Sequence, residues 1–307
     1  MTQRRVLCIV GPTAIGKSEL ADEVARKIHG EIVSIDSMQV YRGMDIGTAK
    51  VPKEEREHLH MVDVVDVSEP YSVTRFQAEA RACVEEIAGR GLVPILCGGS
   101  GLYLDAVIDV MSFPPGKIGD EKRTSYDRLV EEHGARWAYD LLSERDSKSA
   151  ELIHPNNTRR VIRALELHDE GKSYYEHHKG LRNRKHYYDA TIWGLTMPRD
   201  VLYARIDARV DEMVRLGLVD EVKALERLGL RESSTASQAI GYREVLAYID
   251  GQYDLDQAVE LIKRNTRRYA KRQLSWLKRD GRARMLDAAS SSMHELANTI
   301  CRDWGRP

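Results

Sequence analysis

A glycine-rich segment near the N-terminus places the strongest constraint on how this chain can fold. Residues 11–18 read GPTAIGKS; they follow an apolar run at residues 6–10 and precede a helical pattern from Glu19 to about Ile28. The pattern G-x-x-x-x-G-K-[ST] between a strand and a helix directs backbone amides, a helix N-terminus and one lysine toward a shared point, where polyphosphate charge is neutralised. A turn that merely needs a positive φ at Gly16 would not explain the lysine and serine that follow it. The sequence therefore predicts a phosphate-binding loop formed by Gly11, Pro12, Thr13, Ala14, Ile15, Gly16, Lys17 and Ser18.

The composition indicates a soluble protein with a large core. The chain has 307 residues, of which 42% are hydrophobic and 31% are charged, which suffices for one large core or for a core and a smaller domain. No apolar stretch approaches the ~20 residues that span a bilayer, and the N-terminus passes directly into the first predicted strand, so we expect a cytoplasmic protein without membrane segments. The cysteines Cys8, Cys83, Cys97 and Cys301 form no C-x-x-C pair, so we expect reduced thiols rather than a disulfide framework or a zinc site.

Alternating strand-like and helical patterns indicate a parallel sheet in the first half of the chain. Apolar runs at residues 31–35, 61–67 and 92–97 are separated by helical patterns such as residues 74–90. A further apolar run at residues 190–195 is expected to return the chain to the same sheet. The sequence therefore predicts an α/β fold, a P-loop NTPase-like parallel sheet flanked by helices.

The character of the chain changes after the segment FPPG at residues 113–116. Residues 120–172 are helical and charged, with no convincing strand, so we expect an inserted all-helical domain, with the Pro-Gly segment as its hinge. Long helices are predicted over residues 201–228 and 255–278. The predicted organisation is a first core part at residues 1–117, the inserted domain at residues 118–189 and a second core part at residues 190–307.

A second motif, DSMQVY, begins at Asp36 and directly follows the second predicted strand. In open α/β sheets, ligands bind beyond the carboxyl ends of the strands, so Asp36 should face the same crevice as Lys17. Three roles are compatible with it: a catalytic base, a cap of a turn or helix, and support of Mg²⁺ through water. For an isolated aspartate after a strand, the local pattern by itself favours capping.

Two further motifs are ambiguous when each is taken alone. Residues 97–103, CGGSGLY, allow close backbone approach to a ligand around Ser100, but they also suit a tight turn from a strand to a helix. A later helical pattern places Arg159, Arg160 and Arg163 at neighbouring positions, which suits phosphate contacts or a solvated face with ion pairs.

A basic block over residues 263–284 would attract polyanions, although the net charge of the whole chain is −1. Helical spacing separates two stripes within it, Arg268, Lys271, Arg272 and Ser275 on one, and Tyr269, Gln273 and Trp276 on the other. Such a helix suits nucleic acid or a diphosphate, with Trp276 expected in the core. The histidines, among them His58 and His60, supply no clear third ligand, so we expect no histidine metal site.

Together these motifs resemble those of the bacterial tRNA dimethylallyltransferases. In chain order they are GPTAIGKS, DSMQVYRGMDIGTAK, GGSGLY, HPNNTRRVIRALE, QAIGYRE and TRRYAKRQLSW. The resemblance runs from about Val6 to Trp276, and the long second motif and the last one are its most specific parts. Ile15 stands where the family often has a small or polar residue. Serines that replace the family's usual threonines keep the hydroxyl at Ser18, Ser100 and Ser275.

The resemblance implies transfer of a dimethylallyl group from dimethylallyl diphosphate to the exocyclic amine of the adenosine just 3′ of a tRNA anticodon. The substrates would be tRNAs that read codons beginning with U, and the product would be N6-dimethylallyladenosine. It also implies Mg²⁺ as cofactor, tRNA and dimethylallyl diphosphate as partners, and a monomer. Because the target base must leave the stacked anticodon loop, we expect the inserted domain to close on the anticodon stem.

The resemblance also implies roles for individual residues. Asp36 would accept the proton of the amine, since an aspartate is ionised at neutral pH. Thr13 would hydrogen-bond the diphosphate, and Lys17 would stabilise its charge as it leaves. Ser18 would hold Mg²⁺ in part, and Arg272 is the arginine of the last motif expected at the diphosphate. The implied tRNA contacts are Asp36, Ser37, Met38, Gln39, Ser100, Arg123, Arg159, Arg160 and Arg163.

Two other classes of protein share parts of this pattern. A small-molecule P-loop kinase also needs a phosphate loop and Mg²⁺, but it leaves the DSMQVY motif and the basic last helix unexplained. A noncatalytic RNA-binding module explains the basic residues but gives no reason for Lys17, Ser18 and Asp36 to converge.

Overall fold

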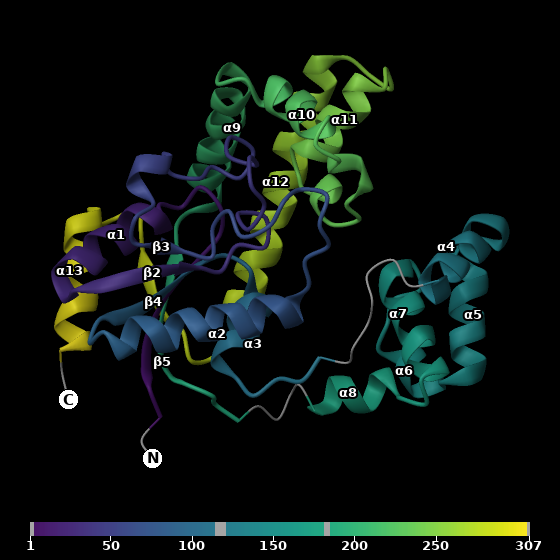
Figure 1. Cartoon of the computed structure of the whole chain (residues 1–307), viewed down its shortest axis with the longest axis horizontal. Coiled ribbons are helices and arrows are strands. Elements are labelled where there is room, and N and C mark those ends of the chain that lie inside the picture. The colour runs from purple at the N-terminus through teal and green to yellow at the C-terminus, as the bar shows by residue number, and fades with distance from the viewer. Residues whose placement is uncertain (1–2, 114–120, 181–184, 306–307) are drawn as a thin grey trace. The chain divides into compact units, whose positions relative to one another are not determined.

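The structure, a computed structural model, describes residues 3–113, 121–180 and 185–305 (Figure 1). The chain forms two compact units, a core unit of Met1–Asp109 with His186–Pro307 and a helical unit of Val110–Lys185. Both bounds of the helical unit lie earlier in the chain than the predicted bounds, 118 and 189. The reason is that the two segments that connect the units already pair at Asp109 and His186. The predicted hinge at residues 114–116 lies outside the described residues.

The core unit contains a parallel sheet, as the alternating pattern predicted. Its strand order is β3-β2-β4-β1-β5-β6, and each neighbouring pair is parallel. The phosphate loop follows the central strand β1, and the DSMQVY motif follows β2, so both leave the sheet at its carboxyl edge. The strands are β1 (Arg5–Val10), β2 (Gly30–Ser34), β3 (Leu59–His60), β4 (Val93–Gly98), β5 (Asp189–Thr196) and β6 (Arg284–Asp287).

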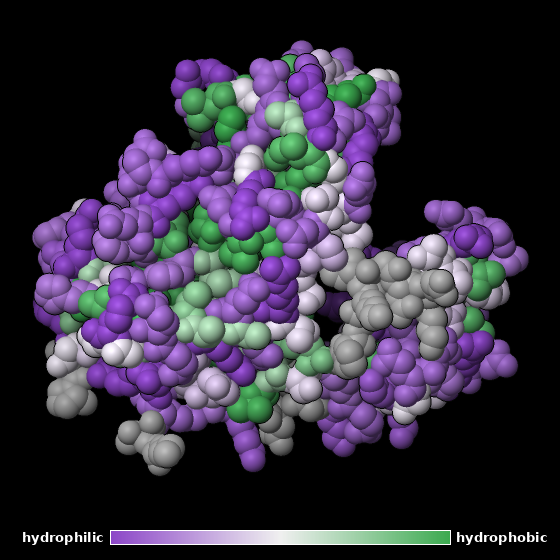
Figure 2. All heavy atoms as spheres, viewed as in Figure 1, coloured by the Kyte–Doolittle hydropathy of each residue, from purple (hydrophilic) through white to green (hydrophobic). Residues whose placement is uncertain are grey.

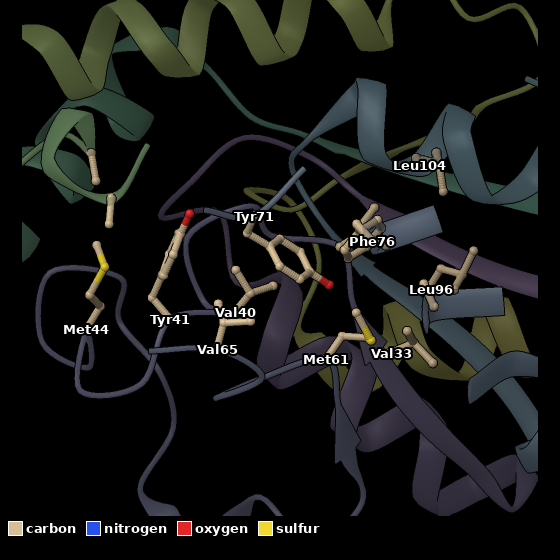
Figure 3. Packing of buried hydrophobic residues seen from close by; sticks show 14 of the residues in the cluster. Val33, Val40, Tyr41, Met44, Met61, Val65, Tyr71, Phe76, Leu96 and Leu104 are labelled. Atoms are coloured by element: carbon tan, nitrogen blue, oxygen red, sulfur yellow. The ribbon is translucent and has the colours of Figure 1, made fainter. Parts of the chain in front are cut away.

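Helices cover both faces of the sheet, so its central strands read as continuous apolar runs. Alternate residues of β1 enter different clusters: Val6, Cys8 and Val10 pack on one face, and Leu7 and Ile9 on the other. Figure 3 shows part of the first cluster around Phe76 and Tyr71. The helices of the core unit are α1 (Lys17–Ile28), α2 (Val73–Gly89), α3 (Gly101–Ile108), α9 (Arg199–Arg215), α10 (Leu218–Glu226), α11 (Tyr242–Ile249), α12 (Leu255–Leu277) and α13 (Met293–Trp304), with short 3-10 turns at Lys53–Glu55, Leu230–Glu232 and Ala236–Gln238.

The apolar run at residues 61–67 was predicted as a strand, and this prediction was wrong. The short strand β3 covers only Leu59 and His60, directly before this run, and the run itself is a folded loop that contributes Met61 and Val65 to the core. Met61 and Asp63 have φ values of 62° and 56°, which no extended strand accommodates. Asp63 is held in this loop by Lys50, whose Nζ donates to it over 2.7 Å.

The long helical pattern at residues 201–228 is divided into α9 and α10. Gly217 lies between them with a φ of 99°, a conformation in which glycine carries no steric penalty. The sequence analysis also did not identify β6 and α13. A capping box marks the start of α13, where Ser292 and Glu295 each bond the other's backbone amide.

The helical unit contains five helices among its described residues and no strand, as predicted for the insertion. They are α4 (Glu121–His133), α5 (Ala135–Arg145), α6 (Ser147–Glu151), α7 (Thr158–Asp169) and α8 (Tyr174–Gly180). The unit has its own small core, in which Tyr126 and Leu142 pack with Val161 and Leu165. Across the described parts of the chain, none of the helices has the length and apolarity that crossing a membrane requires.

Candidate active site

The phosphate loop joins the end of β1 to the start of α1. Gly16, the residue before α1, has a φ of 101°, and Ala14 also has a positive φ of 64°. The side chain of Ile15 is fully buried in the core, so this residue offers a ligand only its backbone. The geometry leaves the first amides of α1 as a site for an anion.

Lys17 is the charged group of this loop. Its Nζ donates a hydrogen bond to the carbonyl oxygen of Pro12 over 2.7 Å. Burial lowers the pKa of Lys17 to about 8, and the nearby Asp36 carboxylate opposes this shift. The lysine is therefore a weakly solvated cation for which an anionic ligand would be a better partner than the surrounding protein.

A cavity of about 280 Å³ opens between the phosphate loop and the helices beyond the carboxyl edge of the sheet. Thr13 of the loop, Asp36 after β2 and Arg272 of α12 all line it. Its apolar wall comes from three elements, Ile206, Val210 and Met213 of α9, Ala239 and Ile240 before α11, and Ile262 of α12. The cavity thus combines an anion-binding end with an apolar lining. We refer to it below as the crevice.

Asp36 lies at the wall of the crevice and makes the contact expected of a cap. Its Oδ1 accepts a hydrogen bond from the backbone amide of Met38 over 2.9 Å, which is the local capping contact. For the other oxygen, no hydrogen bond is found within the described residues. One carboxylate oxygen therefore remains for a substrate proton.

Gln273 connects the two glycine-rich loops, a role that the sequence analysis did not identify. Its Oε1 accepts from the backbone amide of Thr13, and its Nε2 donates to the carbonyl oxygen of Gly99, each over 3.0 Å. A Cβ atom at Gly99 would lie 2.1 Å from that Nε2, so only glycine fits there. Trp276 packs as closely against Gly101, where a Cβ would lie 2.3 Å from its indole ring. The last motif therefore fixes α12 against both loops.

Arg209 of α9 is a second residue that the sequence analysis missed. It lines the crevice, and burial lowers the pKa of its guanidinium. No hydrogen bond or ion pair of this side chain is found in the parts of the chain that the structure describes. Arg272 likewise has no carboxylate partner there, and its guanidinium lies 5.6 Å from the centre of the Tyr269 ring. Arg209 and Arg272 thus make the polar end of the crevice cationic, and Lys17 of the adjoining phosphate loop interacts electrostatically with Asp36 and Arg209.

Ser18 and Gln39 line a neighbouring, larger cavity of about 790 Å³ rather than the crevice. Gln39 accepts from the hydroxyl of Ser34 over 2.9 Å and donates to the carbonyl oxygen of Thr48 over 3.2 Å. Ala49 lines both cavities, so a single loop separates them. On the face of the molecule shown in Figure 2, hydrophobic residues lie among hydrophilic ones over the region of β2 and β4.

The four arginines that were candidates in the inserted domain fall into two pairs. Arg123 and Arg163 both approach the buried Glu166, at 3.5 and 3.1 Å. Arg159 and Arg160, at the start of α7, are exposed, and no carboxylate partner is found for them among the described residues. The ion-paired alternative thus applies to the first pair.

No cluster of histidine, cysteine and carboxylate side chains suited to a metal ion occurs within the described ranges. Cys8, Cys83, Cys97 and Cys301 are free thiols. Burial raises the pKa of Cys97 to about 11, so this thiol beside the phosphate loop is not a nucleophile at neutral pH.

Comparison with known proteins identifies the family. A family model described as IPP transferase matches residues 39–280, and one described as isopentenyl transferase matches residues 4–67. The chain belongs to the IPP transferase family. It is 44% identical over 304 residues to the tRNA dimethylallyltransferase of Carboxydothermus hydrogenoformans, covering 98% of this chain and 97% of that one. It is 47% identical to the enzyme of the same name from Geobacillus thermodenitrificans, covering 91% and 88%.

Solved structures of IPP transferases agree with this assignment. The full-length tRNA isopentenylpyrophosphate transferase of Bacillus halodurans has a TM-score of 0.71 at 42% identity, covering 98% of this chain and 96% of that one. A eukaryotic dimethylallyltransferase crystallised while acting on tRNA has a TM-score of 0.77 at 30% identity, covering 99% of this chain and 80% of that one. The family and the fold expected from the motifs are thereby confirmed.

The contacts of Gln273 lead to a stability prediction for this IPP transferase. Replacing Gln273 with leucine keeps the volume but leaves the amide of Thr13 and the carbonyl of Gly99 without their partner. Since each unsatisfied buried group costs roughly 1–3 kcal/mol, we expect the free energy of unfolding to fall by about 2–6 kcal/mol. Urea denaturation measures it. Gln257→Leu, on an exposed position of the same helix, is the control; an equal small effect in both variants would contradict the bridging role.

Proposed function

We propose that this enzyme transfers a dimethylallyl group from dimethylallyl diphosphate to the exocyclic amine of an adenosine in tRNA, the one immediately 3′ of the anticodon in tRNAs that read codons beginning with U. The observation that carries the proposal is the lining of the crevice. Cationic residues and Asp36 line it together with an apolar wall, in a chain that belongs to the IPP transferase family. The two bacterial relatives described above are named tRNA dimethylallyltransferase. The apolar wall suits the hydrocarbon group of a prenyl diphosphate beside its charged end.

In the reaction, the bond between the allylic carbon and the diphosphate oxygen breaks, and the diphosphate leaves with the electron pair. The exocyclic nitrogen forms the new bond to that carbon and then loses a proton. Lys17, the amides of the phosphate loop, Arg209 and Arg272 stabilise the charge that builds on the leaving group. Thr13 hydrogen-bonds the diphosphate, and no ATP is consumed.

Asp36 takes the proton from the nitrogen. An aromatic amine is a weak nucleophile, because its lone pair is delocalised into the ring, so a carboxylate that accepts the proton as the bond forms lowers the barrier. The oxygen of Asp36 that is not bound to the Met38 amide is available for this step. The hydrogen bond to Met38 holds the carboxylate in place.

The hydroxyl of Ser18 is exposed at the start of α1, where the phosphate loop borders the larger cavity, and it would hold Mg²⁺ beside the loop. A phosphate-loop serine is a usual ligand of Mg²⁺ that is shared with phosphate oxygens and water, and it requires no cluster of carboxylates. Bound there, the ion would neutralise part of the charge of the diphosphate.

Asp36, Ser37 and Met38, which line the crevice, and Ser100, the residue before α3, are suited to contact the flipped adenosine and its neighbours. The charges of α12 support an RNA-facing side. Lys263 and Arg267 pair with Asp211 and Asp207 of α9. The exposed cations Arg264, Arg268 and Lys271 have no carboxylate partner among the described residues, and helical spacing aligns them next to Arg272.

We also propose that the enzyme acts in the cytoplasm and as a monomer. Size-exclusion chromatography with light scattering tests the monomer.

The decisive experiment incubates the enzyme and Mg²⁺ with labelled dimethylallyl diphosphate and an unmodified tRNA, and separately with labelled ATP. We expect label from dimethylallyl diphosphate at the adenosine 3′ of the anticodon, and none from ATP. Phosphate transfer from ATP without prenylation would establish the kinase alternative. RNA binding with no transfer from either donor would establish the noncatalytic one.

The pairing of the α7 arginines gives a prediction about tRNA binding. Arg160→Ala should weaken binding about equally for all substrate tRNAs, since phosphate contacts do not read sequence. It should also flatten the dependence of log affinity on log salt by roughly one unit or somewhat less. Arg163→Ala is the matched variant and should change the slope less, because its guanidinium already pairs with Glu166. Filter binding over a salt series measures both; unchanged slopes in both would remove α7 from the RNA-binding surface.

A further inference from the structure

One carboxylate of α10 holds three consecutive backbone amides of a distant loop. Oε2 of Glu221 accepts from the amides of Asp45 and Ile46, over 3.0 and 2.7 Å, and Oε1 accepts from the amide of Gly47 over 3.2 Å. The hydroxyl of Tyr242 donates to the same Oε1 over 2.7 Å. Four donors thus converge on Glu221. Consecutive amides around one anion form a concave, specific site rather than a chance surface contact.

Tyr242 fixes the same loop a second time through packing. A Cβ atom at Gly47 would lie 2.5 Å from Cε2 of the Tyr242 ring, so the loop backbone rests directly on the ring and requires glycine at this point. The ring is fully buried. Burial and the Glu221 carboxylate raise the pKa of the Tyr242 phenol well above its ordinary value, so it stays a neutral donor at any pH that the enzyme meets.

This clamp joins two walls of the crevice. Gly47, Thr48 and Ala49 line one side, and residues 238–241, which directly precede Tyr242, line another. The loop is also tied to the turn that carries Asp36, since Gln39 bonds the carbonyl oxygen of Thr48. Glu221 itself does not line the crevice. Its contacts nevertheless set how far the loop stands from the segment before α11.

We propose that Glu221, with Tyr242, is a positioning residue that sets the width of the crevice, so that it holds the dimethylallyl group against Asp36 and excludes longer prenyl chains. The inference rests on the proposed function. Glu221 touches no substrate. It acts through the 45–49 loop, whose displacement by about 1 Å would misalign the allylic carbon, and misplacement of this size costs on the order of 10²-fold in rate.

The test replaces Glu221 with glutamine. The side chain keeps its shape, but its amide group presents hydrogens to at least one of the four donors, and the loop loses part of its anchor. We expect kcat/KM for dimethylallyl diphosphate to fall about 10- to 100-fold, through kcat as well as through KM, with KM for tRNA unchanged. We also expect geranyl diphosphate, a longer homologue, to be used better relative to dimethylallyl diphosphate than by the wild type.

Glu226→Gln is the matched control, because Glu226 lies on the same helix and pairs with Arg231 away from the crevice. It should behave as wild type. Tyr242→Phe keeps the ring against Gly47 and removes only the phenol donor; it should change the same two quantities less than Glu221→Gln, and it decides the question if the glutamine variant does not fold.

A structural role alone would lower the amount of folded enzyme and leave the KM values and the ratio of the two prenyl diphosphates at their wild-type values. That result overturns the inference. Absence of prenyl transfer by the wild type would instead overturn the proposed function, so the two failures are distinguishable.

Discussion

Replacing Asp36 with asparagine should lower the turnover number about 10²- to 10⁴-fold, the usual contribution of a positioned proton acceptor. Asparagine keeps an oxygen that can accept from the amide of Met38, so the local cap survives. Only the ability to take a proton is lost. Single-turnover rates of prenyl transfer at saturating substrates, measured beside thermal unfolding and tRNA binding, should therefore show a defect confined to chemistry.

Two controls make this result decisive. Asp66→Asn makes the same chemical change at an exposed carboxylate that pairs with Arg42 and does not line the crevice, so its rate should stay close to wild type. Asp36→Ala removes both the acceptor and the cap, so it should add a loss of stability to the loss of rate. Near-normal turnover of the asparagine variant would mean that Asp36 is simply the cap of the turn.

The assays should be run at or below pH 7. The Asp36 carboxylate supports the charged form of Lys17, so its neutralisation lowers the pKa of that lysine further below about 8. At low pH, Lys17 remains charged in both proteins, and the comparison reports on Asp36 alone.

Local signals were sufficient to predict the parts of the site that lie within one stretch of chain. The phosphate loop has its glycines, lysine and serine between an apolar run and a helix start, and the structure has β1, the loop and α1 in these places. The prediction of a strand at residues 61–67 was wrong because an apolar run is also compatible with a buried loop. Its apolar residues are buried in a folded loop, which Lys50 and Arg56 stabilise by pairing with Asp63.

The residues that the sequence analysis missed act across the chain. Gln273 bonds Thr13 and Gly99, which are 260 and 174 residues away. Glu221 bonds the 45–47 loop, again over 174 to 176 residues. Arg209 is one of several arginines on a helical pattern, and nothing in its neighbourhood distinguishes the one that lines the crevice. Such roles follow from tertiary packing, which a single sequence does not display.

Replacing Lys17 with alanine should lower kcat/KM for dimethylallyl diphosphate about 10²- to 10³-fold, as expected when a positioned group that stabilises transition-state charge is removed. Binding of tRNA should change little, because Lys17 is half-buried at the phosphate loop, where its Nζ bonds the carbonyl oxygen of Pro12. Isothermal titration with dimethylallyl diphosphate and filter binding with tRNA separate the two effects. Loss of tRNA affinity with normal diphosphate binding would contradict the assignment.

The lowered pKa of Lys17 adds a pH dependence whose sign is fixed. In the free enzyme, the lysine is charged below about pH 8 and neutral above it. The bound diphosphate favours the charged form, so binding takes up a proton, and affinity should fall up to about tenfold for each pH unit above 8. The substrate does not contribute to this slope, since a phosphate monoester completes its ionisation near pH ~6. Lys17→Arg keeps its charge throughout this range and should bind with an affinity that is flat from pH 7 to 10, whatever its absolute value. Equal slopes in wild type and the arginine variant would show that Lys17 is not the group that titrates.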